Sequence, residues 1–423
     1  MNVFTRPTPA TAPTRAAFIF IFVTVVLDML ALGIIVPVLP ALVVAFRGGD
    51  TASAASIYGL FGTVWAAMQF VFSPVVGSLS DRFGRRPVIL LSNFGLGADY
   101  VLMAAAPSLE WLFVGRVISG ITSSSFSAAA AYIADVTAPE ERAAKFGMLG
   151  AAFGVGFIVG PTVGGLLAGI SLRAPFWAAA CLSLANFTYG FFILPESLPS
   201  ERRAPFHWRR ANPVGAIQML RSHHLLALAT AGFLSMLAHD SMPNTFVLYT
   251  SYRYRWTERD VGLALAAIGA ASLIVQGGLV GRIVAALGER RALAAGYISG
   301  ALGAAICGLA PTGRIFLLGI PFSAIYGLSQ PAMQSILTRR VGVSEQGRLQ
   351  GATASLNGIA NMSAPIIFTQ LFAFAVGRYR DLNVPGAPFL LASALLVVAL
   401  VVVWRVTGRE ARNGREGQEV RLV

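Results

Sequence analysis

The sequence predicts an all-α polytopic membrane protein, with about twelve transmembrane helices in two pseudo-symmetric six-helix bundles. The first observation behind this fold class is composition, because 56% of the 423 residues are hydrophobic and only 12% are charged. Soluble domains carry about 25% charged residues. The other two observations are a succession of long apolar runs and an internal repeat. Because lipid offers no partner to an unpaired backbone amide, such runs must fold as helices.

Apolar runs follow one another along nearly the whole chain, and each has about 20 residues, the length that crosses a bilayer. The first fifteen residues are rich in Pro, Thr and Ala, and no cleavage site follows the first run. We therefore expect no secretory signal there, and expect the first helix to remain in the protein. Hydropathy windows and breaks place the spans at 16–38, 56–76, 87–106, 110–133, 145–169, 174–194, 223–247, 259–280, 292–310, 313–337, 348–375 and 385–406.

Basic residues are distributed unequally between the two membrane sides that these spans define. Of the 32 Lys and Arg residues, 23 fall on the side of the N-terminus, 8 fall on the other side, and Arg116 falls within a span. Cytoplasmic loops carry the excess of basic residues in membrane proteins. We therefore expect a multi-pass protein of the cytoplasmic (inner) membrane with both termini in the cytoplasm. The net charge of +13 then reflects topology and contact with anionic lipid, and no nucleic-acid partner is expected.

A repeat with an offset of 204 residues divides the chain into two halves. The charged segment 77–87 returns in weaker form at 281–291, and Gly115, Glu141, Gly147 and Pro161 each recur 204 positions later. Glycines and prolines are what a duplicated backbone tends to keep, because they mark special geometry. The expected organisation is a cytoplasmic tail at 1–15, a six-helix bundle at 16–194, a cytoplasmic linker at 195–222, a second six-helix bundle at 223–407 and a cytoplasmic tail at 408–423.

The segment Gly77–Pro87 predicts a short charged loop at the membrane face, since it carries Asp81 and three arginines between two apolar runs. With Asp135 and 140–142 it is expected to form a cytoplasmic ion network. Asp81 could also face the positive N-terminal end of a helix in the other half, such as the eleventh, and hold a cytoplasmic gate shut. The alternative is a solvated surface cluster, in which exposed ion pairs contribute little. The candidate gating residues are Gly77, Asp81, Gly84, Arg85, Arg86, Asp135 and Arg142.

The fifth span is rich in glycine. Its Gly-Val-Gly run does not fit a dinucleotide-binding loop, because no strand precedes it and it lies within the membrane. Small residues four positions apart instead let a neighbouring helix backbone approach closely, and proline bends the helix. The expected packing motif comprises Gly156, Gly160, Pro161, Gly164 and Gly165.

Two carboxylates, Asp28 in the first span and Asp99 in the third, lie among apolar residues. A charge is expensive in lipid, so each carboxylate should face a cavity or a partner, and burial favours the protonated form that a proton carrier needs. A salt bridge that only fixes helix packing is the alternative. Arg116 in the fourth span needs an acceptor, such as Asp28, Asp99 or helix-end carbonyls. It would modulate a carboxylate, or alternatively reach outward as an interface anchor.

Further polar residues within the spans are weaker candidates for proton or substrate binding. Asp240 follows His239 in the seventh span, where Pro243 and Asn244 also suggest a broken, partly solvated helix end. In-span amides either line a cavity or bond helix to helix, and they are Gln69, Asn93, Gln276, Gln330, Gln334, Asn357 and Asn361. Of these, Gln69, Asn357 and Asn361 are the candidates for the binding site.

Residues that would support an enzyme are not found in the sequence. We expect Cys181 and Cys307 to be buried packing residues, because neither has a His or Cys nearby. A nucleophile with its base, a metal cluster and a phosphate loop are likewise not recognisable. The sequence therefore predicts no enzyme, no metal and no cofactor.

Several of these segments resemble the major facilitator superfamily, and the resemblance covers nearly the whole chain. Gly77–Arg86 resembles the family's loop between helices 2 and 3, and the glycines of the fifth span resemble the motif associated with antiporters. The segments 81–87, 115–122 and 131–135 are similar to tetracycline/proton antiporters. By that resemblance, Asp28 and Asp99 match carboxylates important for transport, and Arg116 matches an arginine linked to proton coupling.

One departure concerns the ninth helix, where tetracycline exporters carry an acidic residue. The corresponding run, Gly296–Gly303, contains no carboxylate here, and Gly300 holds the position. The departure leaves the superfamily and proton coupling intact and puts tetracycline itself in doubt.

The expected function is a secondary active transporter that exports a small amphiphilic compound, tetracycline-like or another drug, in exchange for protons by alternating access. Proton-coupled uptake of a small metabolite is the first alternative, because the same fold supports it. A carrier-like receptor that does not transport is the second. The proton gradient is the expected energy source, and substrate, protons and the lipid bilayer are the expected partners, with no obligate protein partner.

Overall fold

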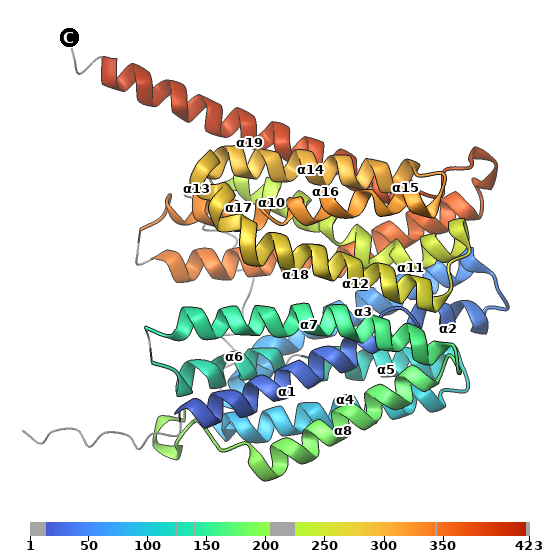
Figure 1. The fold of residues 1–423 in the computed structure, drawn as a ribbon. Helices are drawn as coiled ribbons and strands as arrows, with labels where there is room; N and C mark the ends of the chain where they lie inside the picture. Colours follow the sequence, from blue (N-terminus) through green and yellow to red (C-terminus); the bar gives the residue numbers. More distant parts are fainter. Residues whose placement is uncertain (1–13, 124, 139, 204–224, 343–344, 420–423) are drawn as a thin grey trace, which may run out of the picture.

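The computed structural model describes residues 14–123, 125–138, 140–203, 225–342 and 345–419, and all regular secondary structure in these ranges is helical. Its first half contains eight α-helices (Figure 1). They are α1 Thr14–Ile35, α2 Leu39–Phe46, α3 Thr51–Phe83, α4 Arg85–Ala105, α5 Leu109–Thr122, α6 Ser125–Val136, α7 Arg142–Ala168 and α8 Ala174–Ile193.

The second half continues with the same kind of helices, stacked against the first half (Figure 1). They are α10 Leu226–His239, α11 Ser241–Tyr254, α12 Glu258–Ile274, the π-helix η3 Val275–Leu279, α13 Val280–Leu287, α14 Glu289–Leu309, α15 Gly313–Leu317, α16 Gly319–Tyr326, α17 Ser329–Thr338, α18 Gln346–Val376 and α19 Ala387–Glu419. Two short 3₁₀ turns, η1 Ser200–Arg202 and η5 Arg380–Leu382, complete the described structure.

Ten helical segments of the described residues are long and apolar enough to cross a membrane. The two remaining expected spans, 223–247 and 259–280, are interrupted helices. The first divides into α10 and α11 at Asp240, and the second passes from α12 through η3 into α13. Together these elements make the predicted twelve-helix, two-bundle architecture, and the protein is a multi-pass membrane protein. Of the expected linker at 195–222, residues 204–222 lie outside the described residues.

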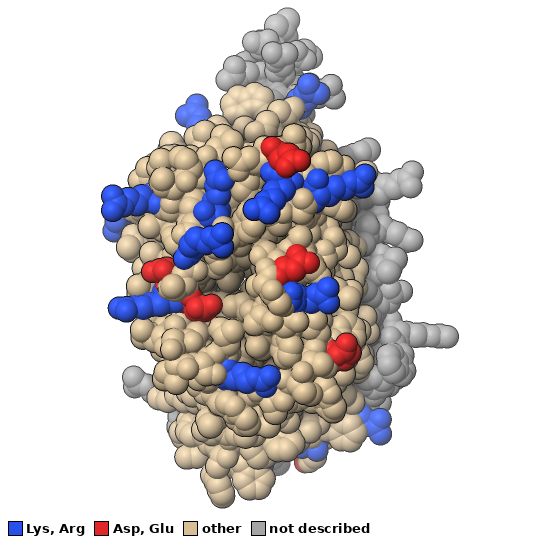
Figure 2. Space-filling view, turned by 90° about the vertical axis from the view of Figure 1, so that its right-hand side faces the viewer, with Lys and Arg blue, Asp and Glu red and all other residues tan. Residues whose placement is uncertain are grey.

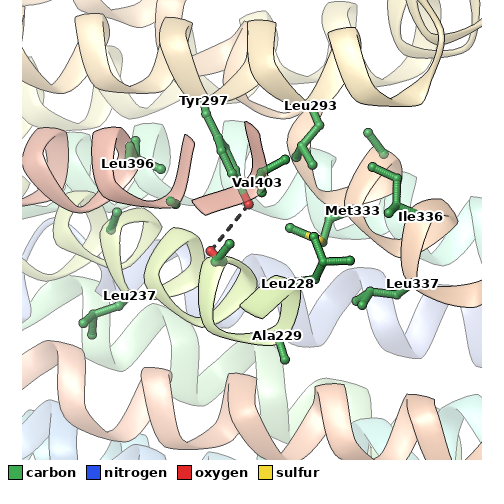
Figure 3. Packing of buried hydrophobic residues seen from close by; sticks show 14 of the residues in the cluster. Leu228, Ala229, Leu237, Leu293, Tyr297, Met333, Ile336, Leu337, Leu396 and Val403 are labelled. Carbon is green, nitrogen blue, oxygen red and sulfur yellow. Dashed lines mark hydrogen bonds between the residues drawn. The ribbon is translucent and has the colours of Figure 1, made fainter. Parts of the chain in front are cut away.

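Apolar side chains form a core within each half, and a further cluster joins Ala55 of α3 to the second half at the end where α2 and α3 connect. In the second half, Leu228, Tyr297, Met333, Leu396 and Val403 come together from α10, α14, α17 and α19 (Figure 3). The Tyr297 hydroxyl donates to the carbonyl of residue 231 at 3.5 Å, which gives this buried ring a polar partner. Each bundle is therefore packed as a unit.

The internal repeat is visible in the backbone. Gly84 and Gly288, 204 residues apart, both end a helix with positive φ, at 104° and 74°. Pro161 and Pro365 both lie inside long helices, α7 and α18. The gap between α1 and α2 at residues 36–38 likewise matches the break at Asp240, since 36 plus 204 is 240. Two halves built from the same helices in the same order explain these coincidences.

The prediction of a loop at 77–87 was wrong. Helix α3 runs to Phe83 and α4 begins at Arg85, so that Gly84 alone separates them. A positive φ is easily adopted by glycine, and one such residue reverses the chain direction without a loop. The charged side chains of this segment therefore lie on helix ends.

One smaller expectation also differs. Cys181 is exposed on the outside of α8 rather than buried, whereas Cys307 is buried. A helix at the edge of a membrane bundle presents one face to lipid, and apolar character does not distinguish that face from the buried one.

The two ends of the molecule differ in how closely the halves approach. We call the end with the α3–α4 junction the Gly84 end and the opposite end, with the α2–α3 connection, the Asp50 end. At the Asp50 end Ser56 Oγ donates to Gln370 Oε1 at 3.1 Å, and Gly62 of α3 packs against Pro365 of α18. Towards the Gly84 end, Gly147 and Gly150 of α7 face open space. The halves therefore close at the Asp50 end.

The surface of the Asp50 end carries both signs of charge, interspersed around its centre (Figure 2). By their positions in the helix order, its arginines are Arg47, Arg173, Arg253, Arg255, Arg259, Arg314, Arg378 and Arg380, and its acidic residues are Asp50, Glu110, Glu258, Asp260 and Asp381. Among the described residues, the larger group of Lys and Arg lies at the other end of the molecule.

Candidate functional site

A cavity of about 970 Å³ lies between the two halves, bounded mainly by α1, α3, α4, α7 and α18. Its apolar wall includes Trp65, Phe70, Phe153 and Phe157. The volume lies in the range that drug-sized ligands occupy, about 300–1,000 Å³. The predicted residues Asp28, Gln69, Asn357 and Asn361 line it, as does Gly77 towards the Gly84 end. An apolar chamber with a few polar groups suits an amphiphilic molecule.

Asp28 is the charged side chain that projects into this cavity from α1. Its Oδ1 accepts a hydrogen bond from Asn186 Nδ2 at 2.8 Å, and the same amide donates to the Thr24 carbonyl at 3.0 Å. Asn186 lies on α8 and is fully buried. It therefore fixes one carboxylate oxygen of Asp28. Sequence reasoning missed this residue, although a lone Asn in the apolar sixth span was the available signal.

Asp99 and Arg116 lie together behind the cavity wall, on α4 and α5. Asp99 is fully buried, and neither carboxylate oxygen has a hydrogen-bond partner. The nearest cation is Arg116, whose Nη2 lies 4.0 Å from Asp99 Oδ2. The same nitrogen contacts Ser119 Oγ at 3.4 Å and Met103 Sδ at 3.3 Å. Arg116 is 8% exposed, which excludes the alternative in which it reaches outward to an interface.

Asp240 occupies the break between α10 and α11. Asn361 Nδ2 donates to Asp240 Oδ2 at 2.8 Å and to the Asn357 carbonyl at 3.1 Å, with its amide oriented by these two acceptors. Asp240 itself is half-buried and does not line the cavity, whereas Asn361 does. The structure thus brings Asp240 to the edge of the site and not into its wall.

A second cavity, of about 680 Å³, extends into the C-terminal half and shares Ala354 and Asn357 with the first. Its polar wall is uncharged and rich in amides, from Gln276, Gln330, Gln334, Gln350 and Asn357. Gln276 lies in η3, and π-turns of this kind are frequent at functional sites. A second cavity was not predicted, although Gln276, Gln330 and Gln334 belong to the in-span amides that the sequence offered as cavity-lining residues.

The structure also explains why no acidic side chain is found at Gly300 on α14. The Tyr326 ring packs against this glycine, so that an added Cβ would lie 2.6 Å from the ring. The Tyr326 hydroxyl donates to the Ser235 carbonyl at 2.7 Å, and the ring stacks on His239 with centroids 5.9 Å apart. The tyrosine therefore fills the space that a side chain at position 300 would need.

The candidate gating residues gather at the Gly84 end. Arg85 lies at their centre: its guanidinium donates to Asp81 and Ser80, and its Nε lies 3.1 Å from Asp135 Oδ2. Arg86 bonds the carbonyl of residue 191, and Arg142 bonds the carbonyls of residues 134 and 137. These contacts all lie within the first half. The structure places Asp81 against Arg85, with 49% of its side chain exposed.

Glu196 is a member of this cluster that sequence reasoning missed. Its Oε1 accepts from the backbone N–H of Arg85 at 2.9 Å and from those of Ser197 and Leu198 at 3.0 Å. Residue 85 is the first of α4, where backbone N–H groups have no partner within the helix. A carboxylate is favourable there, because it caps the helix and opposes the positive end of its dipole.

The second half repeats this salt bridge with its charges reversed. Positions 204 residues after Arg85 and Asp135 are Glu289 and Arg339. Arg339 Nη2 lies 2.8 Å from Glu289 Oε1, which also accepts from Ser335 Oγ. The same two helices are thus tied at the Gly84 end of each half, by opposite arrangements of charge.

The glycines of the fifth span lie on α7 and face two neighbours. Gly156, Gly160 and Gly164 pack directly against the backbone of α1 between residues 29 and 34. Gly165 and Pro161 instead face α12 of the other half, next to Glu258 and Gly262. An added side chain would collide with backbone atoms at each of these glycines, so the motif brings both helices close to α7.

Among the described residues there is no group of three or more His, Cys, Asp or Glu side chains that would hold a metal ion.

Comparison with known proteins gives the same family along most of the chain. The model of the Major Facilitator Superfamily matches residues 21–365. The tetracycline resistance protein of class C from Escherichia coli is 38% identical over 390 residues, covering 92% of this chain and 96% of that protein. The class G protein from Vibrio anguillarum is 35% identical, covering 92% and 98%. Multidrug resistance protein 2 of Bacillus subtilis is 26% identical, covering 94% and 97%.

Solved structures show the same fold at low sequence identity. A peptide transporter POT in complex with sulfate superposes with a TM-score of 0.75 at 14% identity, covering 95% of this chain and 98% of that one. The human organic anion transporter MFSD10 superposes with a TM-score of 0.68 at 23% identity, covering 93% and 100%. The paired bundles and the cavity between them agree with the family model that matches the sequence. The chain belongs to the Major Facilitator Superfamily.

Proposed function

We propose that this protein is a secondary active transporter that exports a small amphiphilic compound, tetracycline-like or another drug, in exchange for protons. The observation that carries the proposal is Asp28, a carboxylate held by Asn186 in an otherwise largely apolar cavity between the two halves. The similarity to tetracycline resistance proteins over 92% of the chain supports the substrate class.

In this proposal the Gly84 end is cytoplasmic, together with both termini, and the protein lies in the cytoplasmic membrane. Bundles at 16–194 and 223–407, joined by a cytoplasmic linker at 195–222, move relative to each other. The basic bias of the Gly84 end supports this orientation. The structure then corresponds to the form that receives substrate from the cytoplasm, because the halves meet at the Asp50 end.

The chemistry assigned to Asp28 is proton exchange coupled to substrate binding. Ionised Asp28 is stabilised by the Asn186 amide and attracts the polar or cationic part of the substrate. After the cavity opens at the Asp50 end, a proton from outside neutralises the carboxylate and weakens that attraction, so substrate leaves. Asp99 and Arg116 lie directly behind the wall, where the guanidinium modulates the charge of the site. Gln69 and Asn357 supply uncharged hydrogen-bonding groups to the substrate.

Alternation between the two forms needs contacts that open and close. We assign the Gly84-end cluster around Arg85 to the cytoplasmic gate, and the α7 glycines to tight closure of α7 against α1 and α12. The proton gradient is the energy source and no cofactor takes part. Partners other than substrate, protons and lipid are not needed for this cycle.

The test uses inside-out membrane vesicles with an imposed proton gradient, acid inside. Addition of tetracycline, or of a panel of cationic and amphiphilic drugs, should release lumenal protons in wild type and not in Asp28→Asn. Asp381→Asn is the matched control, because it removes an exposed carboxylate from the Asp50 end. If folded wild-type protein released no protons with any compound of the panel, the export proposal would be wrong and uptake would be tested next. Binding of labelled drug without flux would indicate a receptor.

A further inference from the structure

The break in the first helix of each half is built differently in the two halves. In the N-terminal half it falls at residues 36–38 and carries Val36 and Pro37, while the matching position in the C-terminal half is Asp240. Val36 demonstrates that this break does not require a carboxylate. Placing one at membrane depth is costly, so Asp240 is expected to serve a purpose other than breaking the helix.

The partners of Asp240 are amides. Asn361 donates to its carboxylate at 2.8 Å, and Asn244 donates to its backbone carbonyl at 2.7 Å. Among the described residues, no Lys or Arg lies within ion-pair distance of it. Its titratable neighbours are His239 on its own helix and Tyr326 on α16, whose rings stack. Charged residues of the packed helices stand at helix ends or, for Arg405, on the exposed face of α19; they are Arg47, Asp81, Arg82, Arg253, Glu258, Arg259, Asp260, Arg348 and Arg405.

We propose that Asp240 is a second proton-binding site, located in the C-terminal half and separate from Asp28. A half-buried carboxylate without a cation is relieved of its charge most simply by a proton. The position of Asp240 also favours a proton over the drug, because Asp240 lines neither cavity while its neighbours Asn361 and His239 do. This inference rests on the proposed proton exchange and adds a second site to it.

The location assigns the site to the Asp50 end. On the repeat, Asp28 corresponds to position 232, and Asp240 lies eight residues further along, about 12 Å at 1.5 Å per residue. Asn244 lies one turn after Asp240 and packs against Gly62 of α3. Pro365 lies one turn after Asn361 and packs against the same glycine. Both helices that hold Asp240 therefore form the closure between the halves. A proton arriving from that side, as that closure opens, meets Asp240 before it meets Asp28.

The proton taken up comes from water and is returned to water, with only an O–H bond of the carboxyl made and broken. Infrared spectroscopy of the purified protein detects it directly, through the C=O absorption of protonated aspartic acid as pH is varied. We expect one pH-dependent component to vanish in Asp240→Asn, and to persist in Asp28→Asn and in Asp381→Asn. In protein whose aspartates are labelled with ¹³C, Asp240→Glu should remove the same isotope-shifted C=O component. Because this variant keeps a carboxyl group at position 240, it controls for misfolding of Asp240→Asn. An unchanged absorption in both Asp240 variants would overturn the assignment.

Transport then separates this inference from the proposed function. Proton and drug fluxes recorded together in vesicles should give one proton fewer per drug molecule in Asp240→Asn, with drug exchange retained. A proton-to-drug ratio equal to that of wild type would overturn the second site while leaving proton-coupled export intact. If Asp240→Asn lost transport of cationic drugs alone and kept the wild-type proton-to-drug ratio, the second proton site would also be overturned. Asp240 would then be a substrate contact. If wild type moved no protons with drug, the infrared component would still identify Asp240 as a proton site, and only the proposed export would fail.

Discussion

At the residue scale, the candidate site depends on one amide as much as on its carboxylate. Asn186 donates to Asp28 and to the Thr24 carbonyl from a position fully shielded from solvent. A hydrogen bond to a charged group contributes about 1.5–3 kcal/mol. The geometry therefore makes Asn186 a positioning residue for Asp28.

Replacing Asn186 by Leu should lower proton-coupled transport by about 10-fold or more, because about 1.4 kcal/mol corresponds to one factor of ten. Transport in vesicles at several pH values measures the effect, and an altered pH profile separates it from simple loss of protein. The matched control is Thr188→Val on the same helix, whose exposed hydroxyl bonds only the carbonyl of residue 184. Equal losses in both variants would contradict a positioning role.

The sequence located Asp28, Asp99 and Arg116 because charges inside apolar spans are costly and therefore conspicuous. It could not indicate which carboxylate enters the cavity, since that depends on the rotation of each helix. Asp28 does so, while Asp99 lies behind the wall against Arg116. Asn186 escaped notice because an amide costs less to bury and is equally compatible with ordinary helix contacts.

At the element scale, the charge-reversed salt bridges tie corresponding helices in the two halves with different strength. Arg85 and Asp135 have side chains 10% and 25% exposed, whereas Arg339 is 74% exposed. Water screens an exposed ion pair, so the pair of Arg339 with Glu289 contributes about 0–1 kcal/mol. The pair around Arg85 is better shielded and is expected to matter more.

Neutralising one residue of each salt bridge should therefore lower the unfolding temperature by different amounts. Asp135→Asn removes the negative charge opposite the shielded Arg85 and should lower the unfolding temperature of purified protein clearly, since a charged hydrogen bond contributes about 1.5–3 kcal/mol. Arg339→Gln should change that temperature little. Thermal unfolding in detergent compares them, and a larger shift for Arg339→Gln would contradict the ranking.

Close packing of α7 on α1 supplies a second test at this scale. A Cβ at Gly160 would lie 2.7 Å from the Gly33 Cα, so Gly160→Leu must separate the two helices. We expect strongly reduced yield of folded protein and loss of transport. Gly150→Leu is the control on the same helix, because nothing lies within 4 Å of a Cβ there. Retention of wild-type yield by Gly160→Leu, measured by size-exclusion chromatography, would count against the packing role.

At the scale of the whole molecule, the halves are held together at the Asp50 end and diverge towards the Gly84 end. Ser56 and Gln370 bond across this closure at 3.1 Å, and Gly59 of α3 packs against Thr369 of α18. A transporter that alternates must break these contacts once in each cycle.

Linking Ser56→Cys to Gln370→Cys with a short bifunctional thiol reagent should therefore abolish transport. Cys181 and Cys307 are first replaced by Ser, so that only the introduced pair reacts. Drug flux in vesicles should disappear on linkage and return when the linker is cleaved. The two single-cysteine variants serve as controls. Full transport by linked protein would be incompatible with alternation at this closure.

The sequence by itself determined the membrane environment, the helical class, the twofold repeat and the family, because these follow from composition, run length and matched glycines that need no knowledge of neighbours. Only the tertiary structure decided which polar residues meet. The Asn186–Asp28 and Asn361–Asp240 contacts join segments 158 and 121 residues apart in the chain. It also turned the predicted loop at 77–87 into two helix ends and filled the space at Gly300 with Tyr326. Side-chain contacts depend on how each helix is rotated against its neighbours, and hydropathy averaged along a span does not report that rotation.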